Sequence, residues 1–195
     1  MEIVNSLPKN LKNDAFEIYH DAFHKKENLK ITFNSKKQAI KLYKRGINFR
    51  SGLYAIKNGR LMGLLGFKSK RNKLIDYKLK TLRKEFGFFG GLIRKIRCFF
   101  SQIEHLSEDE IKIEAIAVDK KYRGKGIGSR LIRRAIHFAK NRKYKRIILN
   151  VVNTNPKAKK LYLRFGFKPI SKSYFGFITN KAGFTSSTKM ALDLN

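Results

Sequence analysis

The sequence predicts an α/β sandwich, formed as one domain of 195 residues with a helical insertion. Apolar patterns typical of strands alternate along the chain with patterns typical of amphipathic helices, which is the arrangement that layered α/β folds require. Hydrophobic residues make up 42% of the chain and include 16 Phe and 8 Tyr, enough to fill a core. No internal repeat or low-complexity segment interrupts the alternation.

The first fifty residues predict two helices. Apolar residues recur at helical spacing between residues 8 and 25. A second helical pattern covers residues 35–45, where Ser35 is expected to cap the N-terminus and Gly46 to end the helix.

Two antiparallel strands are predicted next, at residues 51–57 and 60–68. The dipeptide Asn58-Gly59 joins them. It is the strongest short signal for a hairpin, because both residues tolerate the positive φ angles of a tight turn.

A basic helical insertion is predicted at about residues 69–107, because this segment is longer than an ordinary loop. Its apolar residues recur at helical spacing on both sides of Gly87 and Gly90-Gly91, which predicts two amphipathic helices with a glycine hinge. Leu74 and Ile75 are included in the first of these helices. Three roles stay open: a lid over the substrate, a surface facing a membrane or nucleic acid, or helices packed on the sheet.

Residues 111–118 predict a hydrophobic strand that leads through a charged turn into an amphipathic helix at 126–142. The turn carries three glycines at spacing two, Gly124, Gly126 and Gly128. A glycine-rich turn that opens a helix presents unpaired N–H groups, and the helix dipole adds positive potential. Arg123 and Lys125 add cationic charge, so the turn is expected to bind a phosphate-type anion.

The remaining pattern predicts a strand, a helix and two terminal strands, at residues 146–152, 155–165, 167–178 and 186–194. Asn155 precedes Pro156, which is typical of an N-cap followed by proline in the first helical turn.

Two common phosphate-binding patterns do not fit the glycine turn. A P-loop needs Lys and a hydroxyl residue after its last glycine, whereas Gly128 is followed by Ser129 and Arg130. A dinucleotide fingerprint needs G-x-G-x-x-G and an acidic residue about 20 positions later, where this chain reads NRKYKRI. The pattern that fits is R-x-x-G-x-G, carried by Arg123, Gly126 and Gly128.

This pattern resembles the acetyl-CoA-binding motif of the GNAT family of N-acetyltransferases. A second match, NPKAKKLYLRFGF at residues 155–167, is similar to the family's later motif N-x-x-A-x-x-L-Y-x-x-x-G-F. The chain is thus identified as a bacterial-type member. The resemblance covers roughly residues 50–68 and 111–194, is poor over the first fifty residues and is absent from 69–110.

The resemblance implies a GNAT-type three-layer α/β sandwich with a mixed, mostly antiparallel central sheet. It also implies acetyl-CoA as cosubstrate, with the pantetheine arm between the strands at 111–118 and 146–152, which splay apart in the family. The residues expected to bind acetyl-CoA are Ile116, Ala117, Val118, Arg123, Gly124, Lys125, Gly126, Ile127, Gly128, Ser129, Asn155, Lys157 and Ala158.

Two catalytic residues are predicted. Tyr162 matches the family position that often protonates the departing thiolate; otherwise it packs on the sheet. Glu114 is the only carboxylate within 111–118 and shares strand parity with Ile116 and Val118, so it is the candidate base, acting directly or through water. Its alternative is an exposed strand residue paired with a lysine. Some family members carry a base twelve residues before the tyrosine, but Asn150 cannot act as one.

Cysteine and histidine usage limits other chemistries. The single Cys98 excludes an intrachain disulfide, suggests a reducing compartment and is expected to be a buried core residue. The four His are scattered, so no metal site is expected. No signal peptide is visible and no apolar run approaches the ~20 residues of a membrane span. We therefore expect a cytoplasmic protein.

The charge leaves several partners open. Lys and Arg number 45 against 14 Asp and Glu, a net charge of +31, which reflects capture of polyanionic CoA, binding to nucleic acid or an anionic membrane surface, or compositional bias. The expected function is an acetyl-CoA-dependent N-acetyltransferase that transfers acetyl to a primary amine of unknown identity by direct attack in a ternary complex. The alternatives are a non-catalytic CoA-binding module or a protein whose insertion binds nucleic acid or membrane. A homodimer stays open.

Overall fold

The computed structural model describes residues 1–29, 31–100, 105–176, 179 and 182–194. Within them, one seven-stranded sheet has the order β1-β2-β3-β4-β5-β7-β6. Only β4 and β5 pair in parallel; all other neighbours are antiparallel. The predicted mixed, mostly antiparallel sheet is therefore confirmed. The strands are β1 Glu2–Val4, β2 Gly52–Lys57, β3 Arg60–Lys68, β4 Glu110–Val118, β5 Arg146–Val152, β6 Lys168–Tyr174 and β7 Ser186–Asp193.

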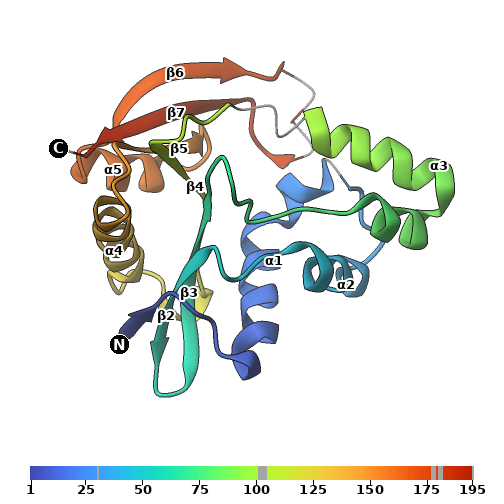
Figure 1. Ribbon diagram of the computed structural model, residues 1–195, viewed down its shortest axis with the longest axis horizontal. Coiled ribbons are helices and arrows are strands. Elements are labelled where there is room, and N and C mark those ends of the chain that lie inside the picture. The colour runs from blue at the N-terminus through green and yellow to red at the C-terminus, as the bar shows by residue number, and fades with distance from the viewer. Residues whose placement is uncertain (30, 101–104, 177–178, 180–181, 195) are drawn as a thin grey trace.

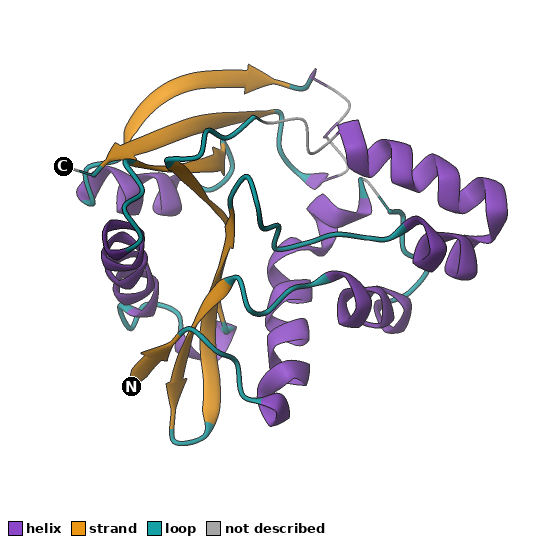
Figure 2. Ribbon diagram, viewed as in Figure 1, coloured by secondary structure: helices purple, strands orange, loops and turns teal. Residues whose placement is uncertain are grey.

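Helices cover both faces of the sheet, which gives the three layers that were predicted (Figure 1; Figure 2). α1 and α2 lie on one face, α4 and α5 lie on the other, and α3 stands outside α2. Two short 3-10 turns, η1 and η2, precede α1 and α4. The helical elements are η1 Lys9–Leu11, α1 Lys12–Asn28, α2 Lys36–Gly46, α3 Leu79–Phe100, η2 Lys120–Tyr122, α4 Ile127–Asn141 and α5 Pro156–Arg164.

The sheet separates two hydrophobic cores. One lies against α1 and α2 and contains fully buried Tyr43 and Tyr54. The other lies against α4 and α5 and contains Leu131, Ile132 and Phe167. Each fully buried side chain of this size stabilises the fold by about 1.5–3 kcal/mol. The sheet is therefore held rigidly from both sides, which fixes the strand ends that form the site.

Local sequence signals set several boundaries as predicted. The Ser35 hydroxyl accepts a hydrogen bond from the Gln38 N–H (3.2 Å) at the start of α2. Asn155 accepts one from the Ala158 N–H (3.2 Å) at the start of α5. Asn58 and Gly59 both have positive φ, 51° and 69°, as a tight hairpin turn requires.

The insertion forms α3, and the helix breaks at Gly87 (φ 73°, ψ 175°) as predicted. The first helical segment begins at Leu79, so the prediction that Leu74 and Ile75 belong to it was wrong. Both residues are buried in an extended segment, where the Asn48 N–H donates to Leu74 O (2.7 Å) and Ile75 bridges to Ile47. Tertiary contacts therefore override the helical spacing there.

Other differences are smaller. Strand β1 was not predicted; its three residues pair with β2 at the sheet edge. The strand predicted at 167–178 ends at Tyr174 in β6, and its last two positions lie outside the described residues. The same holds for residues 180–181, which lie between the two predicted terminal strands. Cys98 is buried, as expected. Among the described helices, none is long and apolar enough to cross a bilayer.

Candidate active site

The central feature of the candidate site is a gap between the two parallel strands. β4 and β5 pair from Glu110–Arg146 as far as Ile113–Leu149 and then separate, although both strands continue. This gives the splay that the family resemblance implied. Backbone groups of β4 on the β5 side beyond Ile113 therefore face the gap instead of a neighbouring strand.

A β-bulge sits where the gap begins. On the other side of β4, Gly66 pairs with Ala115 but Phe67 pairs with Ile113, so Glu114 is the surplus residue. A bulge bends its strand and locally increases the twist, which turns the second half of β4 away from β5.

The bulge also interrupts the regular side-chain alternation that was predicted for β4. Ile116 and Val118 pack toward the core under α4, whereas Ala115 belongs to the core under α1. Glu114 lies close enough to Tyr19 of α1 for its charge to help raise the pKa of that phenol. The prediction that Glu114 shares a face with Ile116 and Val118 was therefore wrong, because a regular strand was assumed.

The gap opens into a cleft of about 310 Å³. Its walls come from β4, β5, the start of α5, the C-terminal part of α1 and the segment before β7. The lining residues are Asp21–Lys26, Ile113–Ile116, Leu149–Val152, Thr154, Asn155, Ala158, Tyr162, Ala182 and Phe184. The cleft thus joins the sheet gap to the surface of α1, so a ligand between the strands would face α1.

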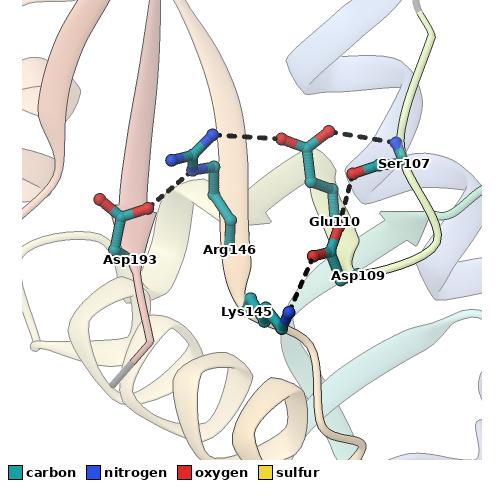
Figure 3. A network of polar contacts seen from close by, with 6 residues as sticks. All are labelled: Ser107, Asp109, Glu110, Lys145, Arg146 and Asp193. Atoms are coloured by element: carbon teal, nitrogen blue, oxygen red, sulfur yellow. Dashed lines mark hydrogen bonds and ion pairs between the residues drawn. The ribbon is translucent and has the colours of Figure 1, made fainter.

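The opposite end of the β4–β5 pair is held closed by a polar network (Figure 3). Arg146 on β5 contacts Glu110 on β4 (3.5 Å) and Asp193 on β7 (2.7 Å). Lys145 contacts Asp109 (3.7 Å), whose pKa is lowered chiefly by the hydrogen bond from the Ser107 hydroxyl. These carboxylates anchor the paired end of the strands and do not reach the cleft.

The glycine turn follows the carboxyl end of β4. Gly124 and Gly126 have φ angles of 78° and 75°, and a β-carbon at either position would meet no atom within 4 Å. The first intrahelical bond of α4 runs from the Arg130 N–H to Gly126 O, so the N–H groups before it point out of the helix end. The turn is open and positive, and its donors fit a diphosphate.

Two cations flank this turn. Arg123 Nε donates to Val118 O (3.2 Å), which ties the turn to the end of β4. The Lys125 ammonium lies 5.7 Å from the centre of the Tyr122 ring. Both side chains are exposed, so they add positive charge beside the glycine turn.

Tyr162 forms part of the cleft wall from α5. It is 6% exposed and packs against Phe167, with ring centroids 5.9 Å apart. Burial raises the pKa of Tyr162 to about 12. The phenol is therefore protonated throughout the physiological range, so it can donate a proton or a hydrogen bond there.

His24 on α1 also lines the cleft, although sequence reasoning did not single it out. Its Nδ1 lies 3.0 Å from the His20 carbonyl oxygen, and its ring stacks on that of His20 at 5.1 Å. Because a carbonyl can only accept, Nδ1 carries the proton and Nε2 of the neutral ring holds the lone pair. The i, i+4 spacing of the two histidines was the signal available in the sequence.

Asn150 occupies the cleft wall where some family members carry a base. With its amide turned to satisfy both ends, Asn150 accepts from Lys112 Nζ (3.0 Å) and donates to Leu149 O (3.2 Å). The side chain therefore links the two separating strands and supplies no carboxylate.

A buried acid and phenol cluster supports the α1 wall of the cleft. Tyr19 donates to Glu27 (3.4 Å), which is 2% exposed. Burial, and then the charge of Glu27, raise the pKa of Tyr19 and of the neighbouring Tyr77. No sequence motif predicted this cluster.

The structure thus brings together only part of the predicted set. Glu114, Ile116, Asn155, Ala158 and Tyr162 line the cleft. The remaining residues belong to the end of β4 and the glycine turn, except exposed Lys157 on α5; they are Ala117, Val118, Arg123, Gly124, Lys125, Gly126, Ile127, Gly128 and Ser129. Over the described part of the chain, no cluster of His, Cys, Asp or Glu is arranged to hold a metal.

Fold and cleft together define an α/β protein whose splayed parallel strands can take an extended ligand with an anionic group at the glycine turn. The family model described as Acetyltransferase (GNAT) family matches residues 15–167. The chain therefore belongs to the GNAT acetyltransferase family.

Individual relatives match only part of the chain. Human N-acetyltransferase 8B is 33% identical over 70 residues, which is 36% of this chain and 31% of that protein. An uncharacterised N-acetyltransferase of Methanocaldococcus jannaschii is 33% identical over 108 residues, 52% of this chain and 48% of that protein. The chain thus spans less than half the length of either. The ribosomal-protein-S18-alanine N-acetyltransferase of Escherichia coli superimposes with a TM-score of 0.58 at 19% identity, covering 100% of this chain and 94% of that one.

Proposed function

We propose that this chain is an acetyl-CoA-dependent N-acetyltransferase that transfers acetyl to a primary amine by direct attack in a ternary complex. The observation that carries the proposal is the gap between β4 and β5 beyond Ile113, with the glycine turn at the end of β4. Family membership supports the same chemistry.

Acetyl-CoA fits the two halves of the site. The N–H groups at the start of α4, from Lys125 to Ser129, would hold the diphosphate. The pantetheine arm would lie along β4 beside Ile116 and Val118 and bond to strand backbone that β5 leaves available. A strand N–H would also polarise the thioester carbonyl.

Acetyl transfer then needs proton movements at two places. The neutral amine attacks the thioester carbon, the C–N bond forms, and the C–S bond breaks as the tetrahedral intermediate collapses. The Tyr162 hydroxyl donates to the departing sulfur. Because a thiol has a pKa near 8.5 and that of Tyr162 is about 12, Tyr162 stabilises the thiolate mainly through a hydrogen bond.

The amine proton would leave on the α1 side of the cleft. Glu114 and His24 both line the cleft there, and each can accept a proton directly or through water. We assign the role of base to Glu114, and His24 is the second group in reach of the same space.

The acceptor would approach past residues Asp21–Lys26 of α1. The Escherichia coli protein of similar fold is named as an N-acetyltransferase of ribosomal-protein-S18 alanine. The net charge of +31 repels cationic acceptors at long range, which disfavours polyamines. A single primary amine, free or at a peptide N-terminus, is the acceptor class that we propose.

One experiment tests the proposal. Calorimetry with acetyl-CoA and with CoA measures binding, and thiol release with a panel of peptides, amino acids and polyamines measures turnover. Binding with turnover of at least one amine supports the proposal, and absence of binding to the folded protein rejects it.

A second candidate function is a CoA-binding module without turnover. The observation that favours it is Asn150, which replaces a family carboxylate and is engaged with Lys112. Tight binding with no thiol release across the whole panel would select this alternative.

A further inference from the structure

The second segment of α3 exposes an apolar face to solvent. Of the eleven exposed large hydrophobic residues in the described chain, six lie on this one helix. They include Phe89 at 76% and Ile93 at 55% exposure. We call this surface the α3 face; it consists of Phe88, Phe89, Leu92, Ile93, Ile96 and Phe99. Contiguous exposed apolar surface of this kind marks an interaction site.

The arrangement is inverted relative to an ordinary surface helix. At about 100° per residue, the α3 face spans an arc of about 140°. Gly91 and Cys98 occupy the other side and are buried against the protein. The polar residues between them bind the body of the domain: Arg94 Nε donates to Ile31 O (2.5 Å) and Lys95 Nζ donates to Tyr77 O (2.8 Å). Polar contacts therefore fix the helix so that its apolar side points outward.

The segment that carries the α3 face is strongly basic. Residues 69–100 contain ten Lys and Arg against two acidic residues. One acidic residue, Glu85, is paired with Lys41 and Arg45 of α2, and the other, Asp76, with Lys95. The guanidinium of Arg83 lies 4.1 Å from the centre of the Phe88 ring, at the edge of the apolar surface. An apolar strip flanked by cations is the pattern of a helix that lies in a lipid interface.

We propose that the α3 face docks this protein on an anionic lipid surface, with the helix parallel to the membrane plane. The phenyl and aliphatic side chains enter the boundary between headgroups and acyl chains, and the flanking Lys and Arg bind anionic headgroups. This proposal is independent of the proposed acetyl transfer, because none of the described residues that line the cleft belongs to α3.

Charge and side-chain type favour an anionic bilayer over two other possible partners of the α3 face, a second copy of the chain and nucleic acid. A second copy of the chain would bring another +31 charge against the same basic segment, which opposes self-association. Nucleic acid would supply the anion, but its affinity comes mainly from contacts between phosphates and Lys or Arg, and the three aliphatic side chains of the α3 face offer its bases no stacking surface. An anionic bilayer satisfies both the charge and the apolar side chains.

The test is cosedimentation of the full chain with vesicles made of equal parts phosphatidylglycerol and phosphatidylcholine, or of phosphatidylcholine alone. The variant carries Phe89→Ser and Ile93→Ser. Its matched control carries Ile170→Ser and Tyr174→Ser on β6, at exposures of 54% and 74%. We expect the α3 variant to bind anionic vesicles about tenfold or more weakly, the control to bind like wild type, and neutral vesicles to bind weakly. Equal binding by the variant and the control overturns the proposal.

A second measurement reports insertion directly. The chain contains no Trp, so Phe89→Trp introduces a single tryptophan on the α3 face, whose emission can be excited selectively, and Tyr174→Trp provides the control. Anionic vesicles should shift the emission of the first to the blue and leave the second unchanged. No shift in either protein overturns the proposal.

The other occupants give distinct results. A dimer in sedimentation velocity without lipid, dissociated by the Phe89→Ser and Ile93→Ser variant, overturns the proposal in favour of a second copy. RNA binding that the same variant abolishes, without vesicle binding by wild type, overturns it in favour of nucleic acid. Circular dichroism and the melting temperature verify that each variant folds.

Discussion

At the scale of single residues, Tyr162 is the side chain whose removal should separate binding from chemistry. We expect Tyr162→Phe to lower kcat by about 10²-fold or more, because the departing thiolate loses its donor. The affinity for acetyl-CoA should change little, since the ring remains packed against Phe167. Steady-state kinetics and calorimetry on the same preparation measure both quantities. An unchanged kcat would remove Tyr162 from the mechanism.

The base is tested by comparing Glu114→Gln with His24→Gln. Both residues line the cleft, and both variants keep the size and polarity of the side chain. We expect Glu114→Gln to lower kcat/KM by about 10²-fold, because the proposed proton acceptor is lost. His24→Gln should leave kcat/KM close to that of wild type. The reverse result would assign the base to the imidazole.

The sequence predicted a role for Tyr162 but not for His24. Tyr162 and Asn155 belong to a motif, and seven residues along one helix keep both on the same face, so their shared place in the cleft was predictable. His24 carries no motif. Its relevance depends on α1 lying against the splayed strands, a contact between segments ninety residues apart that no local pattern encodes.

At the scale of elements, α3 depends on close approach of its two segments. A β-carbon at Gly91 would lie 2.5 Å from the Arg83 backbone nitrogen, so the first segment packs directly on this glycine. We expect Gly91→Ala to destabilise the protein by about 1–3 kcal/mol, because the rigid backbone must move.

The neighbouring Gly90 provides the control. A β-carbon there would lie 3.2 Å from the Phe86 β-carbon and 3.3 Å from the end of the Arg94 side chain. The gain of about 1 kcal/mol in helix propensity then offsets the tight contacts. Denaturant unfolding measures both variants, and similar losses in the two would contradict the packing argument.

Helix α1 should respond to acid through His20. Burial, followed by the charges of His24 and Lys36, lowers the pKa of His20, while Asp21 and Glu17 oppose the shift. The unfolded chain therefore takes up this proton first, near pH 6.5, and the stability present above that pH is lost as the pH falls. The melting temperature of His20→Gln should thus fall less steeply below about pH 6.5 than that of wild type. Exposed His137→Gln is the control and should follow wild type.

Elements with their own local signal were predictable, and those formed by neighbours were not. The hairpin at Asn58-Gly59 and the caps at Ser35 and Asn155 are encoded by single residues and appear as expected. Strand β1 exists because β2 offers an edge, and its three residues carry little pattern. The bulge at Glu114 was invisible, because alternation continues through it in the sequence.

At the scale of the whole molecule, the excess of 45 basic over 14 acidic residues produces strong self-repulsion in the folded state. We expect added sodium chloride to raise the melting temperature, because screening weakens this repulsion more in the compact state than in the expanded chain. Scanning fluorimetry from low to moderate salt measures the shift. A melting temperature that falls with salt would show that ion pairs such as Arg146–Asp193 outweigh the repulsion.

The single surplus residue in β4 has a consequence for engineering this architecture. If β4 lost one residue at Glu114, its pairing with β3 would become regular. The gap between β4 and β5 would then close, because the two strands could continue to pair toward Val118 and Val152. Access for a substrate would then disappear without any change to the glycine turn or to Tyr162. The cleft therefore depends on the number of residues in β4. Inserting or deleting one residue there could create or remove it, and a comparison of side-chain types alone would not reveal the cause.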